Sequence, residues 1–164
     1  HIGYIGGISR QKGIHVLVDA VNALPAAAAT LTIYGAPTVF PEYVSELKEL
    51  IRHPGIKLTG VVDRDQIWSA LAAVDVVVLP SVWMENSPMV VDEVFALGMP
   101  MIASDIGSIN EKIQDGINGR LFAPGDVNAL RDIFAELIMA VGLLSVSKRS
   151  AGIKRRKNLS HAIL

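Results

Sequence analysis

Two short, almost continuously apolar segments constrain the fold of this chain more than any other feature. They are Asp75-Val-Val-Val-Leu79 and Pro100-Met-Ile-Ala-Ser104. This pattern is typical of strands that are buried on both faces of a parallel sheet, because a strand with one solvated face alternates apolar and polar residues. Parallel neighbours need a crossover connection, which is usually a helix. The two segments therefore predict a parallel sheet that is covered by helices.

Helical patterns alternate with further strand candidates, as such a sheet requires. We predict strands at residues 2–6, 30–34, 56–59, 75–79, 100–104 and 119–122. We predict helices at residues 12–24, 40–52, 64–73, 88–98, 109–114 and 126–141. This alternation indicates βαβ units with right-handed crossovers. The expected fold class is α/β, a Rossmann-like open parallel sheet of about six strands with helices on both faces.

Composition and charge narrow the class of protein. Of the 164 residues, 51% are apolar, no apolar run reaches the roughly 20 residues of a membrane span, and cysteine is absent. Disulfides and thiolate catalysis are therefore excluded. Because His1 leads directly into a strand candidate, we expect the sequence to be cut from a longer chain.

Charge is divided unevenly along the chain. Residues 143–164 hold six basic residues and no acidic one, so the rest has a net charge of −7 although the whole chain carries −1. An acidic body argues against a nucleic-acid partner. We expect one folded domain at residues 1–142 and a basic C-terminal tail at 143–164, interpreted as disordered or non-native.

The loops after the strands should form the site, because ligands of an open parallel sheet bind beyond the carboxyl ends of its strands. In the first of these loops, Lys12 follows Gly6 and Gly7 and is placed to meet a phosphate. The alternative is a surface lysine in a first helical turn, although a cation is unfavourable there.

The segment after the fourth strand carries the most specific chemistry. Ser87 followed by Pro88 is typical of a helix start, and the free N–H groups between Ser87 and Val90 can hold an anion. Glu85 lies just before this start, where an exposed loop carboxylate is the alternative. Glu93 lies in the helix among apolar neighbours and needs a partner. Its alternative is a side chain that reaches solvent or forms an ion pair.

Four motifs together resemble family 4 of the retaining glycosyltransferases, which have the GT-B fold. The resemblance covers residues 2 to 140 approximately. The motifs are Gly6-Gly-Ile-Ser-Arg-Gln-Lys12-Gly13, the Glu-x7-Glu pair Glu85 and Glu93, Ala96-Leu-Gly98-Met-Pro100-Met-Ile-Ala-Ser104-Asp-Ile-Gly107, and Glu111-Lys-Ile-Gln-Asp115-Gly-Ile-Asn118-Gly119 with Pro124-Gly-Asp126. The Glu-x7-Glu pair alone is weak evidence, whereas the four in this order are specific.

This resemblance implies the nucleotide-sugar-binding half of a transferase. The enzyme would move a sugar from a nucleoside-diphosphate sugar to an acceptor hydroxyl, with retention at the anomeric carbon. Glu85 would contact the donor sugar and Lys12 the diphosphate, and both are the candidate catalytic residues. Glu93 would accept the ribose hydroxyls. Three further groups of residues would complete the binding site. The first loop would contribute Gly6, Gly7 and Arg10, and the start of the helix would contact phosphate and sugar through Ser87, Pro88, Met89 and Val90. The base would lie beside Gly35, Gly60 and Val61.

The resemblance also implies partners and a location. A missing N-terminal domain would bind a carbohydrate or lipid-linked acceptor, so the isolated chain should bind nucleotide weakly and transfer nothing. We expect no metal or other cofactor, because amide groups and Lys12 can stabilise the leaving diphosphate. The expected location is the cytoplasm, and peripheral association with the inner face of the cytoplasmic membrane is an option for the full-length enzyme. The products would belong to polysaccharide or glycoconjugate biosynthesis.

The chain departs from this family at three places. Gly7 stands where an arginine usually joins the lysine on the diphosphate, and our hypothesis is that Arg10 substitutes for it. Ser108 replaces a frequent second glycine, without an expected consequence. Residues 143–164 do not resemble the family's closing helices.

Several alternatives remain beside this interpretation. Asp63-Arg-Asp65 matches a metal-binding Asp-x-Asp, but capping of the following helix is favoured. Trp83 either lines the sugar pocket or belongs to the core. The first loop lacks Gly-x-Gly-x-x-Gly, which argues against a dinucleotide-binding dehydrogenase. A nucleotide-sugar epimerase or a non-catalytic nucleotide-binding module would share the same architecture.

Overall fold

The structure, a computed structural model, describes residues 1–63, 65–86 and 88–148. Its strands are β1 Ile2–Ile5, β2 Leu31–Tyr34, β3 Ile56–Gly60, β4 Val76–Leu79, β5 Met101–Ser104 and β6 Arg120–Phe122. Its helices are the short 3₁₀ helix η1 Arg10–Lys12, α1 Ile14–Asn22, α2 Pro41–Leu50, α3 Ile67–Ala72, α4 Met89–Ala96, α5 Ile109–Lys112 and α6 Val127–Lys148.

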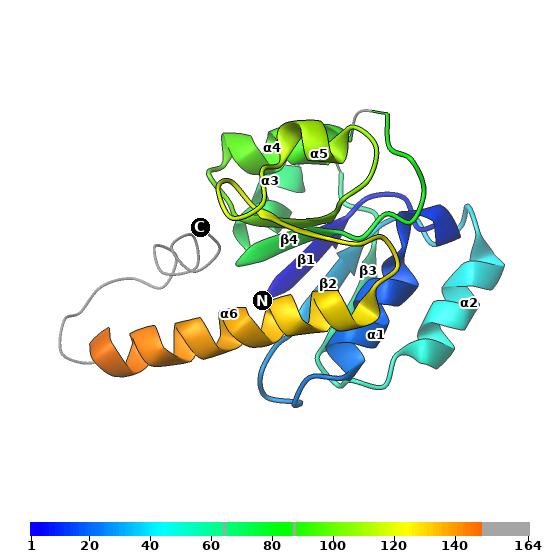
Figure 1. Ribbon diagram of the computed structural model, residues 1–164. Coiled ribbons are helices and arrows are strands. Elements are labelled where there is room, and N and C mark those ends of the chain that lie inside the picture. The colour runs from blue at the N-terminus through cyan, green and yellow to red at the C-terminus, as the bar shows by residue number, and fades with distance from the viewer. Residues whose placement is uncertain (64, 87, 149–164) are drawn as a thin grey trace.

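All six strands are parallel and form one sheet in the order β3-β2-β1-β4-β5-β6. A helix connects each strand to the next, and helices lie on both sides of the sheet (Figure 1). The predicted Rossmann-like α/β class is therefore confirmed. The direction of the strand order changes between β1 and β4, which is where a sheet of this kind opens a crevice at its carboxyl edge.

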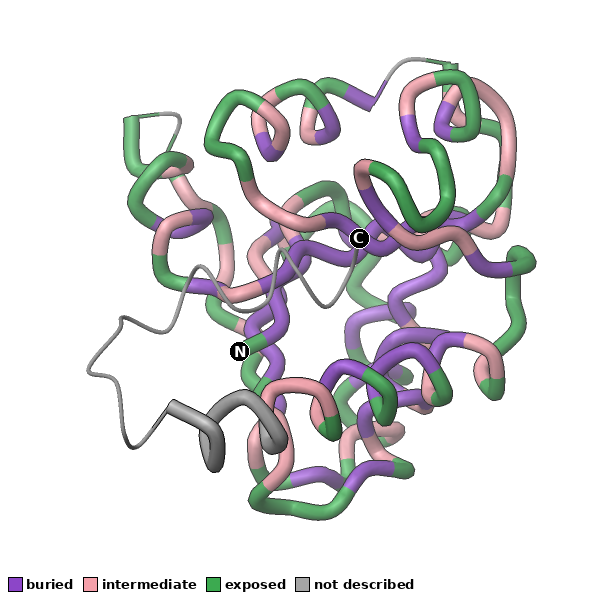
Figure 2. The backbone as a smooth tube through the Cα atoms, turned by 60° about the vertical axis from the view of Figure 1, so that its left-hand side comes forward, coloured by how far each residue is buried: buried purple, intermediate pink, exposed green. Residues whose placement is uncertain are grey.

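Alternate residues of each strand face two separate cores, because successive strand side chains point to opposite sides of a sheet. In β4, Val76 and Val78 pack in the core formed with α1, α2 and α6, whereas Val77 and Leu79 pack in the core formed with α3, α4 and α5. All four are buried, and the strands form the buried centre of the molecule in Figure 2. Burial on both sides explains why this strand is apolar throughout.

The start of α4 differs from the prediction. Pro88 has an extended backbone (φ −70°, ψ 107°), so the helix begins one residue later, at Met89. Pro88 therefore occupies the position before the helix and is not its first residue. The predicted cap, Ser87, lies outside the described residues.

Two other helix ends also differ. α3 begins at Ile67 and is preceded by Gln66, and no side chain caps this helix, so the predicted capping by the Asp63-Arg-Asp65 segment is not found among its described residues. α6 continues to Lys148, past the predicted end at 141, which is possible because a lone glycine weakens a helix but need not end it. The predicted tail thus begins within α6, and residues 149–164 lie outside the described part of the chain.

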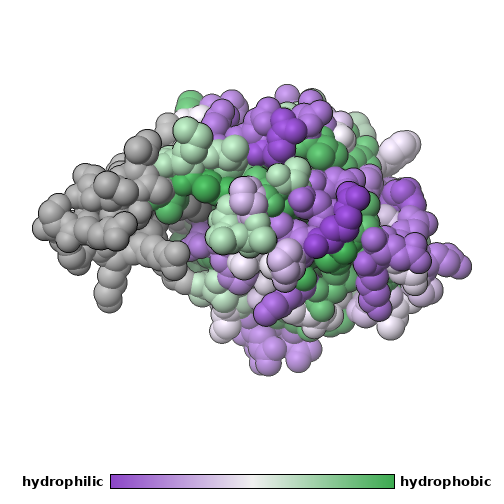
Figure 3. Space-filling model, turned by 90° about the horizontal axis from the view of Figure 1, so that it is seen from below, coloured by the Kyte–Doolittle hydropathy of each residue, from purple (hydrophilic) through white to green (hydrophobic). Residues whose placement is uncertain are grey.

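None of the described helices, α6 included, is both long and apolar enough to cross a membrane. The face that Figure 3 shows from below, where α6 lies, presents a mixture of hydrophilic and hydrophobic side chains.

Candidate functional site

The loops that follow β1 and β4 meet at the carboxyl edge of the sheet. β1 and β4 are neighbours, so the loops at their ends must lie side by side. The backbone N–H of Val82 donates a hydrogen bond to the carbonyl of Gln11 (2.9 Å), which joins the two loops directly. Gly13 permits this contact, because a Cβ atom there would lie 1.8 Å from the carbonyl oxygen of Pro80.

Lys12 and Glu85, the two candidate catalytic residues, form an ion pair between these loops. The Nζ atom of Lys12 lies 2.6 Å from Oε1 and 2.9 Å from Oε2 of Glu85. The hydroxyl of the fully buried Ser81 donates a third hydrogen bond to Oε1 (2.6 Å). The side chain of Glu85 is only 12% exposed and that of Lys12 33% exposed, so the pair is partly shielded from water.

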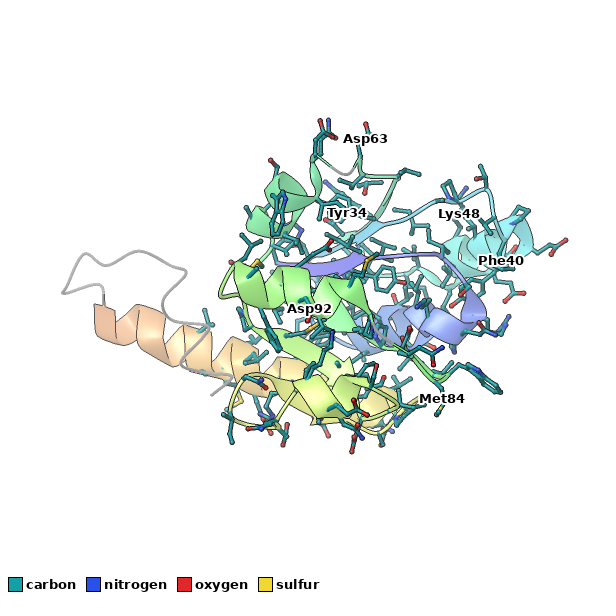
Figure 4. All side chains as sticks on the ribbon, turned by 90° about the horizontal axis from the view of Figure 1, so that it is seen from above. Tyr34, Phe40, Lys48, Asp63, Met84 and Asp92 are labelled. Carbon is teal, nitrogen blue, oxygen red and sulfur yellow. The ribbon has the colours of Figure 1, made fainter. Side chains whose placement is uncertain are left out.

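An open pocket contains this pair. It is lined by Gln11, Lys12, Trp83, Met84, Glu85 and Asn86. Trp83 is 64% exposed, so it lines the pocket and the alternative of a core residue is wrong. Met84 projects outward from its loop in Figure 4. A cation, a carboxylate and an exposed aromatic ring in one pocket are groups that can bind an anionic ligand with a polar, hydroxyl-bearing part.

The β5–α5 turn holds Glu85 from the opposite side. Ser108 donates two hydrogen bonds to the main-chain carbonyl of Glu85, from its N–H (3.1 Å) and from its hydroxyl (2.9 Å). A Cβ atom at Gly107 would lie 2.8 Å from the same oxygen, so this turn packs directly on the Glu85 backbone. Neither Ser81 nor Ser108 was predicted to take part in the site. Ser81 contacts Glu85 because of the shape of their shared loop, and Ser108 contacts it because β5 lies next to β4. Neither the loop shape nor the strand order can be predicted from a local sequence pattern.

The glycines predicted beside the base also come together at this edge. Gly35 N–H donates to the carbonyl of Gly60 (2.8 Å), and a Cβ atom at Gly35 would lie 2.4 Å from the carbonyl oxygen of Gly6. The loops after β1, β2 and β3 are therefore packed against one another. Val61, next to Gly60, is 67% exposed at this edge.

Tyr4, a residue of β1, holds the loop after β1 by a hydrogen bond. Its hydroxyl is buried and donates to the carbonyl of Gly7 (2.7 Å). Burial, and then the negative charge of Glu85, raises the pKa of Tyr4 well above its usual value, so the hydroxyl stays neutral and keeps donating. The N–H groups of Gly7, Ile8 and Ser9 make no hydrogen bond to any described residue.

Glu93 does not lie in a buried apolar stripe. The buried residues of α4 are Val91 and Val94, whereas Met89 is 71% and Leu97 39% exposed on the helix face that Glu93 shares. The expected burial of Glu93 among its apolar neighbours is therefore wrong, because most of the residues three and four positions away lie on the open side of the helix. Its contact with ribose hydroxyls stays a prediction. Glu93 is half-buried and makes no hydrogen bond or ion pair with the described residues.

The backbone of residues 88–90 lies at the start of α4. Pro88 is buried, Met89 is exposed and Val90 is half-buried. Their predicted contact with phosphate and sugar stays a prediction, as does that of Ser87, which lies outside the described residues.

Arg10 lies away from the Lys12–Glu85 pair. Its guanidinium forms an ion pair with Glu46 of α2 and lies 5.2 Å from the centre of the Tyr43 ring. The Tyr43 hydroxyl in turn accepts a hydrogen bond from the N–H of His15 (3.1 Å) and contacts its Nδ1 atom (2.8 Å). These contacts give no support to the hypothesis that Arg10 joins Lys12 on a diphosphate.

We therefore expect Arg10→Ala to change affinity for a nucleoside diphosphate by less than about twofold. It should lower the free energy of unfolding by about 1 kcal/mol or less, because exposed ion pairs and cation–π contacts are individually weak. Calorimetric titration and urea unfolding measure the two effects. A tenfold or larger loss of affinity, about 1.4 kcal/mol, would restore Arg10 to the binding site.

His15 should make the stability of the fold depend on pH. Burial, and then the charge of Arg10, lowers the pKa of His15 below its ordinary value of 6.5. As pH falls below 6.5, the unfolded chain binds a proton that folded His15 does not yet accept, so stability should decrease with falling pH. We expect His15→Gln to make the free energy of unfolding, measured in urea at several pH values, less sensitive to acid. An unchanged pH dependence in this variant would contradict the assignment.

The motif residues that follow α5 stabilise a turn and the start of α6. Asp115 accepts a hydrogen bond from the N–H of Leu121 (2.7 Å), and the amide of Asn118 donates to the carbonyl of Lys112 (2.9 Å), so both shape the turn before β6. Asp126 caps α6 by accepting from the N–H of Ala129 (2.9 Å). Within the described residues, no three histidine, aspartate or glutamate side chains are grouped as a metal site.

Comparison with known proteins identifies the family. Residues 1–140 match the family model described as glycosyl transferases group 1. The chain belongs to this family. The matched range includes every strand of the sheet and both loops that carry Lys12 and Glu85, so the predicted resemblance to a GT-B glycosyltransferase is confirmed.

Three similar proteins show how much of a longer chain this domain corresponds to. Glycogen synthase of Mycobacterium tuberculosis is 31% identical over 132 residues, which are 77% of this chain and 31% of that protein. The structure of HepE from Anabaena in complex with UDP and glucose has a TM-score of 0.77 at 26% identity, covering 98% of this chain and 40% of HepE. The C-terminal domain of LpcC, a glycosyl transferase group 1 family protein of Francisella tularensis, has a TM-score of 0.67 at 25% identity, covering 99% of this chain and 83% of that domain. This chain thus spans less than half of the first two proteins and most of a C-terminal domain.

Proposed function

We propose that this chain is the donor-binding domain of a retaining glycosyltransferase. The enzyme transfers a sugar from a nucleoside-diphosphate sugar to an acceptor hydroxyl, and the other wall of its active site belongs to an N-terminal domain. The observation that carries the proposal is the Lys12–Glu85 pair, held at 2.6 Å in a pocket at the point where the strand order reverses. Retention at the anomeric carbon is taken from the resemblance to family 4.

Each proposed binding residue has a separate task. Lys12 binds the diphosphate, together with the N–H groups of Gly7, Ile8 and Ser9, which make no hydrogen bond to a described residue. These groups stabilise the negative charge that develops on the diphosphate as the sugar leaves. Glu85 accepts hydrogen bonds from sugar hydroxyls, and its contact with Lys12 places the sugar next to the diphosphate. Glu93 accepts the ribose hydroxyls.

Two comparisons support a nucleotide-sugar donor and a transfer reaction. HepE has this fold and binds UDP and glucose. The named relatives include a glycogen synthase and a sulfoquinovosyl transferase from Arabidopsis thaliana, which favours transfer over the epimerase alternative.

A thermal-shift panel of UDP, GDP, ADP and their glucose conjugates tests the proposal on the 164-residue chain. We expect one nucleoside diphosphate to raise the melting temperature, because a ligand that binds only the folded state stabilises it by about 2.7 kcal/mol at a hundred times its dissociation constant. NAD serves as the control and should have no effect. If every member of the panel leaves the melting temperature unchanged at millimolar concentration, the proposal is wrong.

A further inference from the structure

The hydroxyl of Ser108 bonds to a distant main-chain carbonyl and does not cap the helix that follows it. Ser108 occupies the position before α5, where a serine side chain ordinarily accepts a hydrogen bond from an N–H of the first helical turn. No such cap is formed in α5. The hydroxyl instead donates to the main-chain carbonyl of Glu85 (2.9 Å), 23 residues earlier in the chain.

Two donors from one residue fix the orientation of the peptide between Glu85 and Asn86. The N–H of Ser108 donates to the same oxygen (3.1 Å), so two donors hold this carbonyl, which is the number that its two lone pairs can accept. Because the peptide is planar and trans, a fixed carbonyl also fixes the Asn86 N–H in the opposite direction. Asn86 is exposed and lines the pocket.

We propose that Ser108 is a positioning residue that holds the Glu85 backbone so that the Glu85 carboxylate stays against Lys12. Lys12 and Ser81 hold the carboxylate, and Ser108 holds the main chain of the same residue, so Glu85 is fixed at both ends. The anchors come from the loops after β1, β4 and β5, which are consecutive in the sheet. The consequence for sugar binding rests on the function proposed above.

The first test needs no ligand. Lysines are acylated with a limiting amount of an amine-reactive ester, and the products are measured by peptide mass spectrometry. The rate at Lys12 reports how much of the time its amine is held in the ion pair with Glu85. We expect Ser108→Ala to accelerate acylation of Lys12 by about fivefold relative to Lys48, which is what loss of one ordinary hydrogen bond changes in an equilibrium. Ser108→Thr, which keeps the hydroxyl, should restore the wild-type rate, and a purely structural role would not give this rescue.

A matched control is available in α2. The hydroxyl of Ser45 also donates to a main-chain carbonyl, that of Pro41 (3.1 Å), but Ser45 does not line the pocket and makes no hydrogen bond to Lys12 or Glu85. Ser45→Ala should leave the acylation of Lys12 unchanged. If Ser108→Ala also leaves it unchanged, the positioning role is wrong, whatever the chain binds.

The second test measures affinity for UDP-glucose relative to UDP. We expect Ser108→Ala to reduce this ratio by about fivefold, because Glu85 serves the sugar and one hydrogen bond supports it. A wild-type ratio in a variant whose Lys12 reacts faster would show that Glu85 does not bind the sugar. Faster acylation in a chain that binds no nucleotide would overturn the proposed function and leave the positioning role intact.

Discussion

Replacing Lys12 with methionine is expected to lower affinity for the nucleoside diphosphate at least tenfold, or about 1.4 kcal/mol. Methionine keeps much of the length of the lysine side chain but removes its charge. The Glu85 carboxylate, 12% exposed, then keeps only the Ser81 hydroxyl as a side-chain donor among the described residues. A shielded carboxylate without its cation also repels a diphosphate. Isothermal calorimetry on the purified chain, checked for folding by circular dichroism, measures the loss.

Lys48→Met provides the matched control. Lys48 is exposed on α2 (Figure 4), so this variant removes the same charge outside the pocket. It should bind as the wild type does. If Lys12→Met also retains full affinity while Glu85→Gln loses it, the diphosphate does not lie on Lys12 and the assignment of the pocket must change.

Gly13→Ala is expected to destabilise the fold by about 3 kcal/mol or more. Gly13 has a left-handed backbone (φ +65°), and an alanine Cβ would lie 1.8 Å from the carbonyl oxygen of Pro80. The oxygen that this Cβ atom would meet belongs to the main chain, so rotation of a side chain cannot relieve the overlap. The loops after β1 and β4 would have to separate, and the hydrogen bond between Val82 and Gln11 would break with them.

Urea unfolding of the purified chain measures this effect, and Gly7→Ala is its control. Gly7 lies in the same loop, but a Cβ atom there would have no heavy atom within 4 Å outside its chain neighbours. That variant should lose less than about 1 kcal/mol. A loss of similar size in both variants would mean that loop flexibility, and not the close approach to Pro80, explains the glycine at position 13.

The sequence alone determined the architecture, because the physical signals for it are local. The valines of β4 alternate between two cores and must all be apolar, so the strand could be recognised from a run of five residues. The motifs around Lys12 and Glu85 also pointed to the correct edge of the sheet, since loops at carboxyl ends share one side. The comparisons confirm the family that these motifs suggested.

Tertiary structure decided the contacts within the site. Ser108 and Gly107 reach Glu85 because β4 and β5 are adjacent, and no short segment of the chain encodes the strand order. Ser81 reaches Glu85 through the shape of the loop that both residues share. The partners of Arg10 were also not predictable, because Arg10 lies close to Lys12 in sequence but contacts Glu46 and Tyr43 of α2; its role on a diphosphate stays a hypothesis. Periodicity also placed Glu93 among apolar neighbours but could not show that their side of α4 is open, because burial depends on what packs against a helix and not on the helix itself.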